Sequence, residues 1–169
     1  MESLVEVRRF ISNVEFYFYS HLCYNKHMMN ITVENGSAEK REITKKIAEF
    51  FSGELGISHL EEEVFIAFIP GLDKECAGFT IKDLNAISVG IAAKLNLFDM
   101  IVTVAHEMVH VGQMARGELR VAYESGTPIT YWKGRPTKVA YQNQPWEIEA
   151  SALEVILSKK LVMKLGLAV

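Results

Sequence analysis

Hydrophobic side chains recur at three- and four-residue steps in several stretches of the chain, the spacing that one buried face of a helix requires. The first stretch, 3–22, is predicted to be an amphipathic helix that packs one face on the core. A second helix is predicted over about 38–52, with Ser37 as its N-cap and with Gly53 and Gly56 ending it.

Two later helices are marked by their boundary residues. Asp99 stands where an N-cap belongs and Gly117 where a glycine often follows a helix end, so a helix is predicted between them. Pro145 suits the first turn of a last helix, which continues to about Leu165 and stops at Gly166.

Three short segments rich in β-forming residues lie between the second and third helices. They are 64–70, 77–81 and 86–92. Strands in such quick succession predict an antiparallel or mixed sheet rather than repeated βαβ units. The expected fold class is therefore α+β, with a small sheet.

Residues 117–144 show no helical period and are interrupted by glycines and prolines. We expect a long loop there, one that can hold a hairpin through 129–132. Loops of this length in a compact domain are usually functional.

Length and composition fit one globular domain over 1–169. The chain has 169 residues, of which 49% are hydrophobic and 23% charged, enough apolar material for a sizeable core. The net charge is −3, and the one locally basic stretch, 40–46, alternates charged with apolar residues at helical spacing. We interpret that stretch as a solvated helix face, so a nucleic-acid partner is not expected.

The expected cellular compartment follows from the lack of a signal peptide or membrane-spanning segment and from the small number of cysteines. The start of the chain lacks a basic segment followed by an apolar one, and no apolar run is long enough to span a membrane. The two cysteines, Cys23 and Cys76, have no nearby partner in sequence. We therefore expect a cytoplasmic protein in which both are buried, reduced thiols.

The segment 102–113, VTVAHEMVHVGQ, carries the strongest chemical signal. On a helix, His106 and His110 share one face, so both imidazoles can bind the same zinc ion. Glu107 is rotated about 100° from His106, beside the ion, where it can take a proton from a water that zinc activates. This is the H-E-x-x-H pattern of zinc hydrolases. The alternative is a helix with two ordinary histidines, but its apolar flanks make unsatisfied polar side chains costly there.

A catalytic zinc ion usually has three protein ligands. No His follows His110, no Asp follows Asp99 and no Cys follows Cys76. A third ligand later in the chain is then one of five glutamates: Glu118, Glu124, Glu147, Glu149 and Glu154.

Two of these five, Glu147 and Glu149, lie in the first turns of the last predicted helix, where the helix dipole favours a carboxylate. Glu147 shares its face with Ala150 and Ser151, small residues that let another helix approach. We favour Glu147 as the ligand and keep Glu149 as the alternative.

The motif TVAHEMVH followed by PWEIEA resembles the gluzincins, the zincin class with two helical histidines and a later glutamate. The Glu147-x-x-Ala150 step is similar to the third-ligand segment of ImmA/IrrE-type peptidases and of CAAX prenyl endopeptidases. The resemblance implies that His106 and His110 bind zinc with Glu147 and that Glu107 is the general base. Those families commonly continue with Asn or Asp where this chain has Ser151, so a supporting contact to a histidine is expected to be missing or altered.

The segments HEMVHVGQ, YWKG and PWEIEA also resemble small zincin-like proteins of phage and bacterial genomes, over about 86–157. The resemblance implies a zincin-like metallopeptidase that acts on a peptide or protein. It further implies a sheet edge along the substrate groove, for which 86–92 is the candidate. For a donor to the transition-state oxyanion we consider Tyr123, Tyr131 and Tyr141.

Three other interpretations remain. The chain could be a binding or regulatory protein that keeps a metal site, although the intact Glu107 weighs against it. It could be a metal-free packing domain. A SprT-like protease linked to nucleic acid is disfavoured because a third histidine and a basic zinc-ribbon tail are lacking.

Overall fold

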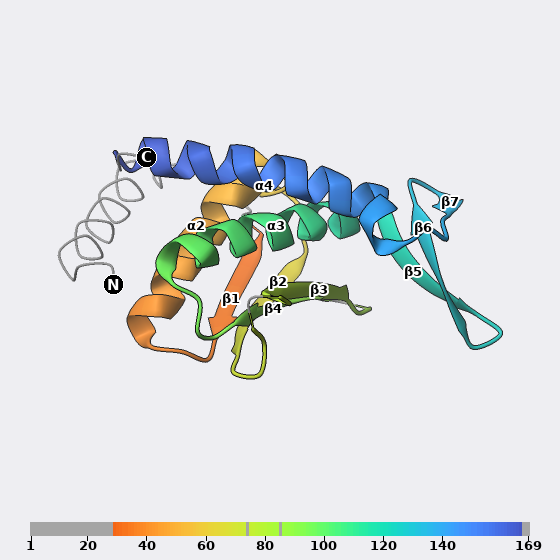
Figure 1. The fold of residues 1–169 in the computed structure, drawn as a ribbon, viewed down its shortest axis with the longest axis horizontal. Helices are drawn as coiled ribbons and strands as arrows, with labels where there is room; N and C mark the ends of the chain where they lie inside the picture. The colour runs from red at the N-terminus through yellow and green to blue at the C-terminus, as the bar shows by residue number, and fades with distance from the viewer. Residues whose placement is uncertain (1–28, 74, 85, 167–169) are drawn as a thin grey trace.

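The computed structural model describes residues 29–73, 75–84 and 86–166. The predicted helix over 3–22 and Cys23 lie outside the described residues. Within them the protein is a mixed α+β fold with two sheets (Figure 1).

The central sheet has four strands: β1 (Asn30–Glu34), β2 (Glu63–Ile69), β3 (Gly78–Lys82) and β4 (Ala86–Ala92). Their spatial order is β1-β2-β4-β3, with β1, β2 and β4 parallel and β3 antiparallel to β4. The three predicted strands and the mixed sheet are confirmed, whereas β1 was not predicted. The expectation that 86–92 forms the edge is wrong, because β4 pairs on both sides and β3 is the edge strand beside it.

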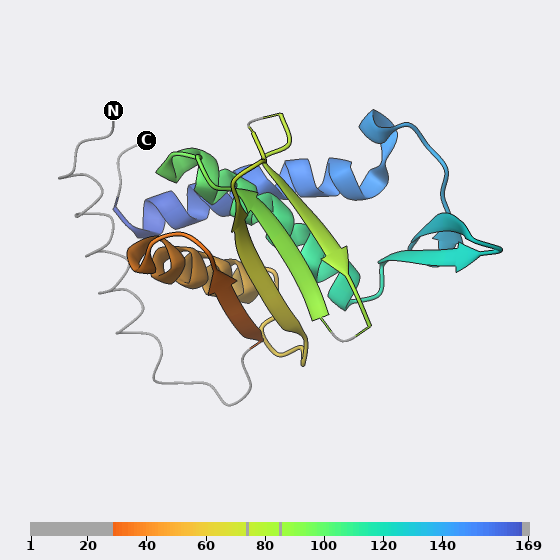
Figure 2. The ribbon, with the colours of Figure 1, turned by 90° about the horizontal axis from the view of Figure 1, so that it is seen from below.

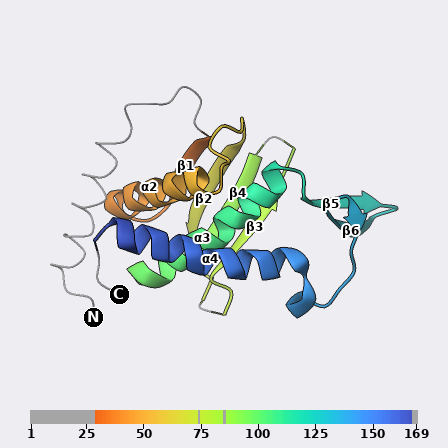
Figure 3. The ribbon, with the colours of Figure 1, turned by 90° about the horizontal axis from the view of Figure 1, so that it is seen from above.

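All three described helices cover the same face of this sheet: α2 (Ala38–Glu54), α3 (Leu97–Ala115) and α4 (Pro145–Lys164). Figure 2 shows the sheet in front of the helices, and Figure 3 shows the helices in front of the sheet. Alternate residues of β2 and β4 are buried under them, namely Val64, Ile66, Phe68, Ile87, Val89 and Ile91. The core therefore lies between sheet and helices, and α3 also packs along α4.

The ends of α2 and α3 follow from local hydrogen bonds. Ser37 caps α2 as predicted, its Oγ accepting from the Lys40 amide at 3.2 Å. Gly56, with φ of +66°, follows the helix, but Gly53 lies inside it and does not end it. The prediction of Asp99 as the cap of α3 is wrong, because the Asn96 side chain accepts from the Asp99 amide at 2.8 Å and starts the helix earlier.

A second sheet occupies most of 117–144, where a long loop was expected. We call it the outlying sheet; it is antiparallel and consists of β5 (Leu119–Glu124), β6 (Thr127–Trp132) and β7 (Arg135–Pro136). Residues 129–132 lie in β6, which pairs with β5 and β7 in two hairpins, so the hairpin predicted there is confirmed. Each of its two turns places a non-glycine residue and then a glycine at positive φ, the geometry of tight hairpin turns. The outlying sheet projects from one end of the molecule (Figures 1 and 2).

The chain returns through the short 3-10 helix η1 (Tyr141–Asn143) to α4. Pro145 is in the first turn of α4 and Gly166, at φ of +65°, follows its end, both as predicted. None of the helices in the described ranges has the length and apolar character needed to cross a membrane.

The prediction that Cys76 is buried is wrong. The Asp73 carboxylate accepts from the amides of Glu75 and Cys76 at 2.9 and 3.2 Å, which forms a surface turn before β3. Cys76 is exposed on this turn.

Candidate metal centre

His106 and His110 lie one helical turn apart in the middle of α3. Their ring centroids are 4.8 Å apart with an edge-to-face angle of 77°, and the two Nε2 atoms approach to 3.1 Å. Because α3 lies between the sheet and α4, the pair is largely withdrawn from solvent; His110 is buried. The two imidazoles thus present the same ring nitrogen to one point, as the helical spacing predicts.

Glu147 completes the cluster from the first turn of α4. Its Oε2 lies 3.3 Å from His106 Nε2 and its Oε1 lies 3.3 Å from His110 Nε2. The structure therefore brings together the three residues that the sequence suggested as metal ligands, and this group could hold a metal ion.

Three of the other four candidate glutamates contact residues outside the cluster. Glu149 accepts from Gln113, Glu118 pairs with Arg116, and Glu124 accepts from the Tyr131 hydroxyl. Glu154 does reach the cluster, although at the far side of the His106 ring.

The spacing of the three ligand groups is close to that around a tetrahedral ion. Two ligands bonded to such an ion at about 2.0–2.1 Å lie about 3.3–3.4 Å from each other. The two Nε2 atoms are 3.1 Å apart, and each lies 3.3 Å from a different oxygen of Glu147, His106 from Oε2 and His110 from Oε1. Two imidazoles with one carboxylate are also a donor set that catalytic zinc sites use.

Hydrogen bonds on the outer side of each ring direct both Nε2 lone pairs toward this point. His106 Nδ1 donates to Glu154 Oε2 at 2.6 Å, and His110 Nδ1 donates to Gln113 Oε1 at 2.8 Å. A neutral imidazole protonated on Nδ1 is an acceptor at Nε2. Two nitrogen lone pairs and a carboxylate therefore face one another, an arrangement that calls for a cation between them.

The pKa values of His106 and Glu147 in the ion-free cluster also indicate that positive charge is favoured between these groups. Burial lowers the pKa of His106, but its contacts with Glu147 and Glu154 outweigh that and raise the pKa to about 9. Burial likewise opposes ionisation of Glu147, yet its contacts with His106 and His110 hold its pKa well below the usual range. In the absence of a metal ion, a proton on His106 takes the place of the cation.

Sequence reasoning did not assign Glu154 and Gln113 as supporting residues. Ser151, at the position where Asn or Asp was expected from the resemblance, is exposed, and Glu154 supplies the contact from one helical turn later. The sequence signal that could have identified Glu154 is its seven-residue spacing from Glu147, because residues two helical turns apart lie on the same face. The signal for Gln113 is its three-residue spacing from His110, because side chains three residues apart on a helix are neighbours.

Glu107 lies on the side of α3 that faces β3. Its side chain is only 4% exposed, and its Oε2 accepts from Thr80 Oγ1 at 2.6 Å. Burial raises the pKa of Glu107, and the Thr80 hydrogen bond offsets part of that shift. Gly78 leaves room for it, because a Cβ at that position would come within 2.6 Å of Glu107 Oε1.

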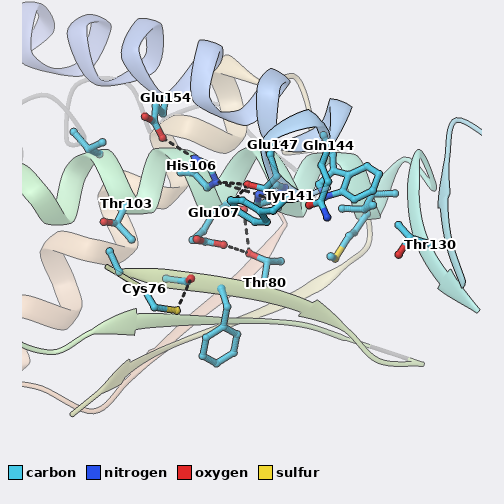
Figure 4. A pocket seen from close by; sticks show the side chains of 18 of the residues that line it. Cys76, Thr80, Thr103, His106, Glu107, Thr130, Tyr141, Gln144, Glu147 and Glu154 are labelled. Atoms are coloured by element: carbon cyan, nitrogen blue, oxygen red, sulfur yellow. Dashed lines mark hydrogen bonds and ion pairs between the residues drawn. The ribbon is translucent and has the colours of Figure 1, made fainter. Parts of the chain in front are cut away.

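A cleft of about 660 Å³ opens over these residues (Figure 4). Its lining includes Gly78 and Thr80 of edge strand β3, Val121 and Thr130 of the outlying sheet, and the cluster itself. Cys76 also lines it.

Of the three tyrosines considered as oxyanion donors, Tyr141 lines the cleft and donates to Glu147 Oε2 at 3.1 Å. Tyr123 does not line the cleft, and Tyr131 bonds to Glu124 instead. Trp132 and Trp146 pack with ring centroids 6.1 Å apart and join the outlying sheet to the start of α4.

No protein-family model, no curated protein and no solved structure matches this chain. Its function is therefore inferred from the site.

Proposed function

We propose that this chain is a zinc-dependent peptidase of the gluzincin type. His106, His110 and Glu147 would hold the ion, and Glu107 would be the general base. The observation that carries the proposal is the meeting of two imidazole Nε2 atoms from α3, 3.1 Å apart, with the Glu147 carboxylate from α4. Each nitrogen lies 3.3 Å from one of the two carboxylate oxygens, a spacing close to that around a tetrahedral ion.

When bound, zinc would polarise a substrate carbonyl and lower the pKa of a water molecule. The role of Glu107 is to accept the proton of that water and return it to the leaving amine. A carboxylate suits this task when its pKa is raised toward the working pH, as burial does here. Thr80 holds Oε2 of Glu107 against β3, so the carboxylate keeps one orientation.

The intact Glu107 also distinguishes this proposal from a purely structural metal site. Such a site has no use for a buried carboxylate beside its ligands, where burial disfavours the charged form.

The shape of the cleft supports an extended peptide as the substrate. The cleft is lined by β3, the edge of the central sheet, and by Val121 and Thr130 of the outlying sheet. A peptide can add to a sheet edge as a further strand, with its backbone held by strand hydrogen bonds. In that position its scissile carbonyl would pass above the cluster.

Zinc content and hydrolysis together test the proposal. We expect one equivalent of zinc, with an anomalous diffraction peak at the His106, His110 and Glu147 atoms. We expect Glu107→Gln to retain the zinc and to lose about 10²- to 10⁴-fold in the rate of cleavage of a broad peptide library. The matched control is Glu118→Gln, because Glu118 pairs with Arg116 and does not line the cleft.

Two outcomes would contradict the proposal. A zinc peak on other residues, or none after zinc soaking, would remove the metal centre. Zinc at the site with no cleavage above the Glu107→Gln background would favour the non-catalytic binding protein.

A further inference from the structure

Glu149 lies two residues after a metal ligand but has a different set of contacts. Its Oε2 accepts from Gln113 Nε2 at 2.8 Å and its Oε1 lies 3.4 Å from Lys133 Nζ. Lys133 is in the turn between β6 and β7, and its ammonium group lies over the Trp132 ring at 4.6 Å. Glu149 thus connects α4 to the outlying sheet.

Gln113 continues this connection to the metal centre. Its side chain is fully buried, with 0% exposure. Its Nε2 donates to Glu149 Oε2 and to the Trp146 carbonyl at 3.1 Å, and its Oε1 accepts from His110 Nδ1 at 2.8 Å. An unbroken series of contacts therefore joins Lys133, Glu149, Gln113 and His110.

The chemistry of these groups determines which atom donates and which accepts in each hydrogen bond. A carboxylate and a backbone carbonyl can only accept hydrogen bonds, so together they require the NH₂ group of Gln113 on their side. The amide oxygen of Gln113 then faces His110, and only the Nδ1–H tautomer can donate to it. That tautomer leaves Nε2 of His110 unprotonated, which is the form that binds a metal ion.

We propose that Glu149 is a positioning residue of the metal centre: through Gln113 it fixes the His110 tautomer and couples metal binding to the docking of the outlying sheet. The inference rests on the metal centre of the proposed function but not on its peptidase activity. Coupling of this kind is reciprocal, so a bound ion also stabilises the docked sheet.

The tryptophans provide a reporter at the junction. The chain has two, Trp132 on the outlying sheet and Trp146 on α4, packed against each other. Their fluorescence therefore responds to a change in this contact. We expect zinc to change the emission of the full-length protein, with the same midpoint as zinc binding measured by chelator competition.

The variant Glu149→Gln tests the tautomer directly. It keeps the shape of the side chain but can present either an oxygen or an NH₂ group to Gln113. We expect about tenfold weaker zinc binding, and imidazole ¹⁵N shifts of the zinc-free protein that show a mixture of His110 tautomers. Glu124→Gln is the matched control, because Glu124 is a carboxylate of the outlying sheet whose partner is the Tyr131 hydroxyl rather than Gln113. It should behave as the wild type.

Several results would overturn the inference. Wild-type tautomer and zinc affinity in Glu149→Gln would show that Glu149 has no such role and would leave the metal centre intact. Unchanged tryptophan emission on zinc binding would remove the coupling to the outlying sheet, and it can be measured on the wild type even if the variant does not fold. Absence of zinc binding by the wild type would overturn the metal centre together with this inference.

Discussion

Glu154 accepts a hydrogen bond from His106 Nδ1 at 2.6 Å from a position two helical turns beyond Glu147 on the same helix. One face of α4 therefore carries both Glu147, a candidate ligand, and Glu154, which orients the ring of the candidate ligand His106 through its Nδ1 atom. Support of this kind fixes the ring and raises its basicity toward the metal.

We predict that Glu154→Gln weakens zinc binding about 10- to 100-fold, because an amide that replaces the carboxylate accepts less strongly from His106 Nδ1. Chelator competition measures the affinity. Ser151→Ala is the control, since Ser151 is exposed one turn earlier and should leave the affinity unchanged. Equal effects of the two substitutions would contradict the assignment of Glu154.

Gly78→Ala is predicted to disable Glu107 without removing the metal. The added methyl group would lie 2.6 Å from Glu107 Oε1 and 2.9 Å from Thr103 Cγ2, so the carboxylate must move. We expect zinc affinity close to wild type, loss of peptide cleavage, and a destabilisation of about 1–3 kcal/mol from overpacking. Cleavage assays and thermal unfolding measure these effects.

Gly53→Ala is the matched control for this substitution. Gly53 lies within α2 and a Cβ there meets nothing within 4 Å. It should leave cleavage unchanged and raise the free energy of unfolding by up to about 1 kcal/mol. Full activity in Gly78→Ala would show that the position of Glu107 against β3 is unimportant.

Tyr141→Phe is predicted to lower kcat about 10²- to 10³-fold, with a smaller change in KM, if its hydroxyl serves the transition-state oxyanion. The hydroxyl lies in the cleft, 3.1 Å from Glu147 Oε2. Tyr123→Phe, on an exposed residue outside the cleft, should have no effect. A wild-type kcat in Tyr141→Phe would assign the tyrosine to support of Glu147 alone.

Zinc affinity is predicted to rise with pH up to about 9 and then to level off. The pKa of His106 in the ion-free protein is raised to about 9, so below that value zinc must displace a proton, at a cost of about tenfold in affinity per pH unit. Affinities measured between pH 7 and pH 10 test this. A flat profile between pH 7 and pH 9 would contradict it.

The stability of the zinc-free protein should show the opposite trend. The folded-state pKa of His106 lies above its unfolded value of 6.5. Its contribution to stability is therefore fully present below about pH 6.5 and is lost as the pH rises through about 9. Thermal unfolding with and without zinc should accordingly show a zinc increment that grows over this interval.

Most of the fold could be predicted because its signals are local. The boundaries of α2 and α4 follow from a serine cap, a first-turn proline and glycines at positive φ. Apart from the hairpin through 129–132, the outlying sheet was missed because its turns use Ser125-Gly126 and Lys133-Gly134 rather than Asn-Gly or Asp-Gly. The edge position of β3 depends on pairing between strands that are not neighbours in sequence, which a single sequence does not reveal.

The ligand cluster was likewise predictable as far as helical spacing reaches. His106 and His110 share a face of one helix, and elimination left five glutamates. The choice of Glu147 over Glu149 depends on how α4 rotates against α3, a property of packing rather than of sequence periodicity. The same rotation turns Glu154 toward His106 and Glu149 toward Gln113.

The division of the ligands between α3 and α4 has a consequence for the time at which the site forms. His110 and Glu147 are separated in the chain by the whole outlying sheet. At ordinary rates of synthesis the ribosome needs a time on the order of seconds to add that interval. Until α4 has been made and has packed on α3, the nascent chain offers only two imidazoles, a weak place for zinc. The proposed metal centre therefore cannot form until α4 has been synthesised.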